Sequence, residues 1–216
     1  SPWTYLAFTN IMGVLDRTGA TMTLRPILVG GVFNAVNPAV YAAREASDNP
    51  KLLHSWRTLR DWAALAGVAL NFPSQYHPAK SVNAMRMACG LADDPAALHA
   101  FTKAAFESYF GAQENLDDPD VLVAVANSVG LDGDALRARA QSDDVKALLR
   151  ANTDELIARG EPDAGVDDAL AVHLAQAAVV GGNVGVLVAT PAADIQDQDV
   201  VEFVLARLDI AEHPLE

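Results

Sequence analysis

The residues best placed to do chemistry are the first two, Ser1 and Pro2. Serine is a favoured N-cap residue, and proline at the first helical position loses no N–H that the helix needs. The N-terminus of a helix carries unsatisfied N–H groups and a partial positive charge, which together favour an anion. A hydroxyl at that place can therefore help to bind an anionic group, although an ordinary helix cap requires the same residue type.

The other reactive residue types favour structural roles. Cys89 is the one cysteine of the sequence, so neither an internal disulfide nor a site of four thiolates can form, and we expect this thiol to be buried and inert. The histidines lack the spacing of a metal site, so we predict no metal; they are His54, His77, His99, His173 and His213. Three aspartate pairs stand at predicted helix starts, where capping explains them better than acid–base catalysis; they are Asp93-Asp94, Asp117-Asp118 and Asp143-Asp144.

The charge balance limits the partners of this chain. Lys and Arg total 15 against 28 Asp and Glu, the net charge is −13, and no basic cluster interrupts the acidity. A surface that tracks phosphates needs clustered cations, so nucleic acid and an anionic membrane surface are disfavoured as partners. No apolar run reaches the roughly 18–20 residues of a membrane-spanning helix. With a single cysteine, these features are typical of a cytoplasmic protein.

Apolar periodicity and caps predict the elements that would position these residues. We expect a helix from Pro2 to just before Gly19 and a strand over Ala20–Leu28, and Gly30-Gly31 is expected to break the pattern. Between about residues 50 and 160, nearly every segment has a helical pattern. The predicted helices there are Leu52–Ala66, Ser81–Leu91, Pro95–Phe110, Asp120–Val129, Asp132–Ala140 and Asp143–Arg159.

The pattern changes after Gly160. The predicted elements are an acidic loop over residues 161–168, a helix over Ala169–Val180, a buried strand over Val184–Thr190 and a closing amphipathic helix over Gln198–Leu208. This order of strand, helical insert, strand and helix is typical of an α/β thioredoxin-like fold that carries a large all-helical insertion. We therefore predict a thioredoxin-like domain from residues 1–48 and 161–216, and an inserted helical domain from residues 49–160.

Several short motifs occur in an order that resembles one family. Ser1-Pro2-Trp3-Thr4-Tyr5-Leu6 is similar to the SP-aromatic-x-YL motif of 2-hydroxychromene-2-carboxylate isomerases and kappa-class glutathione transferases, which have a DsbA-like thioredoxin fold. Leu24–Phe33 is similar to the RPxLLGGVF segment of that family. Further matches, in the family's order, are Asn37-Pro38, Pro50-Lys51, Trp62-Ala63, Phe72-Pro73, Asn83-Ala84-x-Arg86, LDDPDVL at 116–122 and KALLRANT at 146–153. The resemblance covers residues 1–160, whereas residues 161–216 match in outline only.

The resemblance implies a thioredoxin fold in which a redox C-P-x-C motif has become Ser1-Pro2-Trp3-Thr4. It implies that Ser1 and the helix dipole stabilise the thiolate of bound glutathione as the catalytic group. In this family a β-strand comes immediately before the serine, so we expect the first strand of the fold to be missing from this chain. The residues implied to bind glutathione are Val186, Gln198 and Asp199, and those implied to contact an acid substrate are Asn37 and Lys51.

The activity that the resemblance implies is a glutathione-dependent isomerisation of a small aromatic acid in aromatic-compound catabolism. The thiolate adds reversibly to the unsaturated substrate, the ring opens, a bond rotates and glutathione is eliminated, with no net redox change. A glutathione transferase is one alternative, and a non-catalytic thioredoxin-like binding protein is another. Leu187, which replaces the family's cis-proline, and Val200, which replaces its arginine, favour the binding protein because both lie where glutathione should bind. The sequence leaves open whether the chain forms a homodimer.

Overall fold

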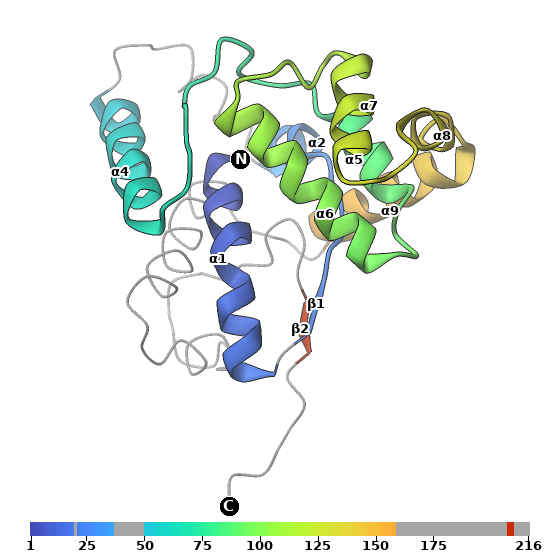
Figure 1. Cartoon of the computed structure of the whole chain (residues 1–216), viewed down its shortest axis with the longest axis horizontal. Coiled ribbons are helices and arrows are strands. Elements are labelled where there is room, and N and C mark those ends of the chain that lie inside the picture. The colour runs from blue at the N-terminus through green and yellow to red at the C-terminus, as the bar shows by residue number, and fades with distance from the viewer. Residues whose placement is uncertain (20, 37–49, 159–206, 210–216) are drawn as a thin grey trace, which may run out of the picture.

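A computed structural model of the chain describes residues 1–19, 21–36, 50–158 and 207–209. Its helices are α1 (Pro2–Thr18), α2 (Val29–Val36), α4 (Pro50–Ala66), α5 (Val82–Cys89), α6 (Pro95–Phe106), α7 (Pro119–Ser128), α8 (Gly133–Arg139) and α9 (Asp143–Ala158). A π-helical turn, η1 (Glu107–Gly111), continues α6, and two strands, β1 (Thr21–Thr23) and β2 (Arg207–Asp209), form one antiparallel pair. The described part is mostly helical, and α1 packs against α4 on one side and α6 on the other (Figure 1).

Local signals set both ends of α1, as predicted. The Ser1 side chain caps its first turn, and Pro2 occupies the first helical position. Gly19 ends the helix in the left-handed region with φ 67°, and its N–H donates to the Leu15 carbonyl at 2.8 Å. Glycine adopts this conformation without the steric penalty of a side chain. The predicted boundaries of this helix are therefore confirmed.

The strand predicted over Ala20–Leu28 is right for Thr21–Thr23 and wrong for Leu24–Leu28. The ladder pairs Thr21 with Asp209 and Thr23 with Arg207, and then stops. Beyond it, Pro26 has no N–H to donate, and the Leu28 N–H donates to the Thr153 side chain on α9 instead of to a strand.

The closing helix predicted over Gln198–Leu208 is wrong at Arg207 and Leu208, because these residues pair with β1 as strand β2. The rest of that helix lies outside the described residues, as does the strand predicted over Val184–Thr190. That the first strand of the family's fold is missing from this chain stays a prediction.

The break in secondary structure predicted at Gly30-Gly31 is wrong, because both residues lie inside α2. Glycine in a helix costs about 1 kcal/mol relative to alanine, so local propensity argues against this helix. The compensation is packing against α9, since a Cβ at Gly31 would lie 3.4 Å from the Thr153 methyl group. The small residue allows α2 to approach α9 closely, and tertiary contact decides the conformation.

Residues 50–158 are described without interruption and contain helices but no strand. Aspartates start three of these helices as side-chain caps. Asp94 accepts from the Ala97 N–H at 3.0 Å, and Asp118 accepts from the Asp120 N–H at 2.9 Å. The interpretation of these two aspartates as helix caps is therefore confirmed.

One hydrophobic core joins α1 to these helices. Its most deeply buried members are Leu6, Leu59, Met87, Phe101, Leu122, Ala126 and Ala140. Phe110 is also buried in it, and the helix expected to run from Pro95 to Phe110 changes to π geometry at Glu107. The division into a thioredoxin-like domain and an inserted helical domain stays a prediction. Within the described ranges, every helix is too short or too polar to cross a bilayer.

Candidate functional site

The N-terminus of α1 presents the Ser1 hydroxyl at the protein surface. The Thr4 N–H donates to Ser1 Oγ over 3.4 Å, and the Tyr5 N–H donates to the Ser1 carbonyl over 3.2 Å. Ser1 is exposed, whereas Thr4 and Tyr5 are buried. The first hydrogen-bonded turn thus fixes the hydroxyl at the positive end of a 17-residue helix, where an anion is favoured.

The side chains behind this turn form an aromatic cluster. The Tyr5 ring stacks on Phe106 and Phe110, with centroids 5.5 and 5.6 Å apart. Phe110 lies 6.2 Å from Phe72, whose edge contacts Trp56 at 5.9 Å. The cluster therefore joins α1, α4, α6, η1 and the segment between α4 and α5, and it packs against the start of α1.

Sequence reasoning missed this aromatic cluster, although part of its signal was present. Tyr5 and Phe8 are three residues apart on α1, and Phe106 and Phe110 are four apart, so each pair shares a helix face. Phe8 also contacts Phe106, at 5.5 Å. Two such aromatic faces indicate two helices that pack together, but periodicity does not say which helices meet.

Two buried tyrosines near the site are neutral hydrogen-bonding groups. Burial, and then the charge of Glu107, raise the pKa of Tyr5 above its ordinary value. Burial raises the pKa of Tyr109 to about 12, and its hydroxyl donates to the Tyr76 carbonyl at 3.2 Å and lies 3.4 Å from His77 Nδ1. At neutral pH both phenols keep their protons, so they contribute no negative charge next to an anion.

The other predicted site residues are placed only in part. Lys51 lies in the first turn of α4, which packs against α1. Asn37, Val186, Gln198 and Asp199 lie outside the described residues. Of the predicted site residues, Ser1 is therefore the one whose side-chain geometry the structure describes.

Two motifs that carry the family resemblance have a structural role here. Arg25 Nη1 donates to Glu155 at 3.0 Å, and Arg25 Nη2 donates to Asn152 Oδ1 at 3.2 Å. Asn152 in turn donates to the Pro26 carbonyl at 3.1 Å. The segment after β1 is thereby tied to α9, so the RPIL and KALLRANT segments join α9 to the part of the chain that carries α1.

Cys89 is buried, as predicted, with 3% of its surface exposed. Burial raises the pKa of its thiol to about 11, so the reactive thiolate is scarce at neutral pH. Across the described segments, no three His, Cys, Asp or Glu side chains come together in a way that could bind a metal ion.

Comparison with known proteins shows the family to which the chain is similar. Residues 1–173 match the family described as DSBA-like thioredoxin domain. A relative from Sphingobium xenophagum, named 2-hydroxychromene-2-carboxylate isomerase, is 32% identical over 136 residues, which are 63% of this chain and 67% of the relative. A solved structure of a 2-hydroxychromene-2-carboxylate isomerase is similar with a TM-score of 0.60 and 24% identity, over 74% of this chain and 76% of that one.

The chain therefore belongs to the family of DSBA-like thioredoxin domains and has the DsbA-like thioredoxin fold. Within that family its relatives include 2-hydroxychromene-2-carboxylate isomerases, so the identification made from the sequence motifs is confirmed.

Proposed function

We propose that the protein is a glutathione-dependent isomerase of the 2-hydroxychromene-2-carboxylate type, active in the catabolism of aromatic compounds. The observation that carries the proposal is Ser1, an exposed side chain that caps the first turn of α1. The family and the name of the relative from Sphingobium xenophagum support the reaction class.

The start of α1 fits the sulfur of glutathione. A serine hydroxyl has one O–H donor and two acceptor lone pairs. Ser1 Oγ accepts from the Thr4 N–H with a lone pair, a contact that does not use the O–H donor. Capping and catalysis are therefore compatible in one side chain. When bound, glutathione supplies the nucleophilic thiolate for reversible addition to the unsaturated substrate.

The residues of the chain have distinct roles in this proposal. Ser1 donates a hydrogen bond to the anionic sulfur, which is worth about 1.5–3 kcal/mol for a charged acceptor. The dipole of α1 adds about 0.3–1 kcal/mol. The residues proposed to bind the remainder of glutathione are Val186, Gln198 and Asp199, and those proposed to contact the carboxylate of the substrate are Asn37 and Lys51.

Calorimetric titration of the full-length protein with glutathione tests this proposal. We expect Ser1→Ala to weaken binding of glutathione tenfold or more at neutral pH, because the charged hydrogen bond is lost. S-methylglutathione has no thiolate, so its affinity should be the same for the original protein and for Ser1→Ala. Ser128→Ala removes an exposed hydroxyl at the end of α7 and serves as the matched control.

The reaction itself is measured by the isomerisation of 2-hydroxychromene-2-carboxylate. We expect turnover only when glutathione is added, and a loss of at least tenfold in Ser1→Ala. The absence of glutathione binding by the intact protein would overturn the proposal and favour a non-catalytic thioredoxin-like protein. Turnover without glutathione would overturn the role given to the thiolate.

A further inference from the structure

The outer face of α4 carries a row of four exposed side chains. The row consists of Leu53, Arg57, Asp61 and Leu65, which follow one another at intervals of four residues. Side chains at this interval form one ridge along a helix. Leu59, which is 1% exposed, marks the opposite side of α4, where the helix contacts the core. α4 lies at one edge of the molecule and packs against α1 (Figure 1), so the row faces away from the protein.

The two ends of the row are apolar. Leu53 is 48% exposed and Leu65 is 64% exposed, and they are the two most exposed large apolar side chains among the described residues. Single apolar side chains on a surface are ordinary. These two, however, occupy both ends of one ridge, about 18 Å apart along the helix axis. A partner that covers both must present two apolar groups at the same separation, as a second α4 does.

The middle of the row carries one charge of each sign. Arg57 and Asp61 are both exposed, and within the described ranges neither takes part in an ion pair. If the row is turned antiparallel against a copy of itself, Arg57 faces Asp61 of the second copy, and Leu53 faces Leu65. A two-fold symmetric contact requires a surface that is complementary to itself in this way.

The charge of α4 also suits a second copy of this chain. α4 has three basic residues and one acidic residue, a net charge of +2, whereas the whole chain has a net charge of −13. It is the most positively charged of the described helices. Two acidic chains repel each other, so the contact that costs least is one that places the basic residues of α4, Lys51 and Arg60 included, near the acidic remainder of the other copy.

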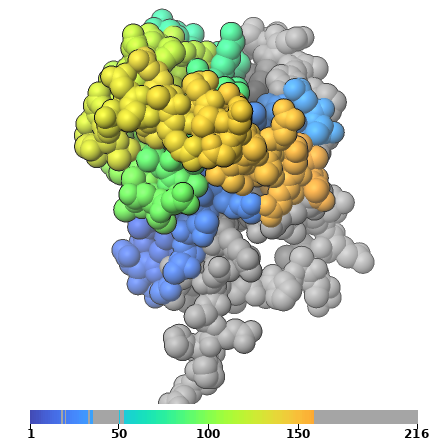
Figure 2. Space-filling view, turned by 90° about the vertical axis from the view of Figure 1, so that its right-hand side faces the viewer, coloured from blue at the N-terminus to red at the C-terminus, as the bar shows by residue number. Residues whose placement is uncertain are grey.

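The face of the molecule opposite to α4 is a less suitable partner for this row. α8 and α9 form a large part of that face (Figure 2), and their first turns carry Asp134, Asp143 and Asp144. Each of these carboxylates already forms an ion pair with a nearby arginine or lysine. A contact between α4 and that face would also be head-to-tail, and it would produce rings or filaments instead of a dimer.

We propose that two copies of this chain associate through α4. The two α4 helices lie antiparallel across a two-fold axis between Arg57 and Asp61, so each Arg57 pairs with Asp61 of the other copy and each Leu53 covers a Leu65. Specific interfaces bury roughly 1,200–2,000 Å², and one helix from each copy provides an area at the small end, so the dimer is weak. The proposal goes beyond the proposed function, because association is measured without glutathione or substrate.

The test is sedimentation equilibrium of the full-length protein at concentrations from about 1 μM to about 1 mM, the range in which weak association is seen. We expect the mean mass to rise with concentration from that of one chain to that of two. Arg57→Glu places a glutamate opposite each Asp61 and should weaken association at least tenfold, since the axis repeats the pair and attraction becomes repulsion. Asp61→Arg should weaken it to a similar extent.

Two further variants make the test specific. The double variant Arg57→Glu/Asp61→Arg exchanges the charges and restores both pairs, so it should associate as the original protein does. Arg150→Glu makes the same change of net charge at an exposed position of α9 and should leave association unchanged. Far-UV circular dichroism of each variant checks that the helices are intact.

Three results would overturn the proposal. A single-chain mass at every concentration would show that α4 has no partner in a second copy. Association that Arg57→Glu leaves unchanged, or that the double variant does not restore, would place the contact elsewhere. Stronger association in Asp61→Arg, or masses above that of two chains, would indicate a head-to-tail contact of α4 with an acidic face.

Discussion

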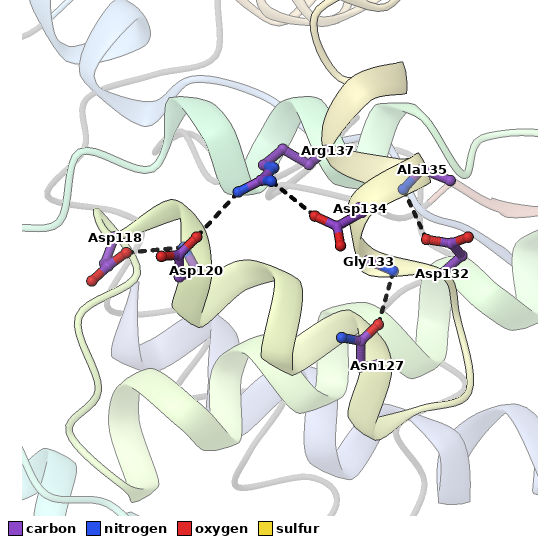
Figure 3. A network of polar contacts seen from close by, with 8 residues as sticks. All are labelled: Asp118, Asp120, Asn127, Asp132, Gly133, Asp134, Ala135 and Arg137. Carbon is purple, nitrogen blue, oxygen red and sulfur yellow. Dashed lines mark hydrogen bonds and ion pairs between the residues drawn. The ribbon is translucent and has the colours of Figure 1, made fainter.

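Among the glycines that the structure describes, Gly133 is the one where an added methyl group should destabilise the protein most. This glycine is buried at the first position of α8, where a Cβ would lie 2.5 Å from the Val123 carbonyl oxygen and 2.9 Å from its Cγ1. Its N–H donates to Asn127 Oδ1 at 2.9 Å (Figure 3). Gly133→Ala must therefore push α8 away from α7, because backbone occupies the space that the Cβ needs.

The magnitude follows from three opposing effects. Overpacking a well-packed contact costs about 1–3 kcal/mol. Weakening the hydrogen bond to Asn127 costs about 0.5–1.5 kcal/mol. The higher helix propensity of alanine returns at most about 1 kcal/mol. We expect a net loss of roughly 2 kcal/mol, which for a protein of this length lowers Tm by about 4–8 °C.

The matched control is Gly13→Ala, which makes the same change inside α1. A Cβ at Gly13 would meet only the end of the Arg17 side chain, at 3.5 Å, and Gly13 is exposed. We expect this variant to be more stable by about 0.5–1 kcal/mol. Urea unfolding and thermal scans measure both changes. If Gly133→Ala is as stable as the original protein, the close contact between α8 at Gly133 and α7 at Val123 is wrong.

Two further predictions concern the packing around α1 and α9. Asn152→Ala removes a buried amide that accepts from Arg25 and donates to the Pro26 carbonyl, so it should lower the free energy of unfolding by about 1–3 kcal/mol. Glu155→Gln changes a partly exposed ion pair and should lower that free energy by about 1 kcal/mol or less. Equal losses of the two variants in urea unfolding would contradict this prediction. His99 stacks on Phe8 at 4.7 Å, and burial, and then the charge of Lys103, lower its pKa in the folded state. The unfolded chain then binds the proton first, so stability should fall as the pH drops from about 6.5 to the lower folded pKa. His99→Phe keeps an aromatic ring and removes the titrating group, so the free energy of unfolding of this variant should change less over that pH range. If the variant and the original protein lose stability with falling pH to the same extent, the prediction is refuted.

The sequence predicted the candidate site where its geometry is local. Ser1 was expected at a helix start, and the hydrogen bond that confirms it reaches only to Thr4. The aromatic cluster behind Ser1 was not predicted, because Tyr5 and Phe110 come together from distant parts of the chain. Helical spacing indicates which face of a helix is apolar, but it does not name the partner.

The sequence by itself determined the ends of helices that carry a local cap or stop. Caps such as Asp94 and Asp118 and stops such as Gly19 act within a few residues, so the residues that decide these boundaries are neighbours along the chain.

Only the tertiary structure decided the segments where local preference is weak or unfavourable. α2 passes through Gly30-Gly31 because α9 offers a close contact, and the segment after β1 bonds to α9, where the Leu28 N–H donates to the Thr153 side chain. Helix caps are satisfied by nearby atoms, whereas a strand or a glycine-containing helix gains its stability from backbone groups and surfaces that only folding brings near.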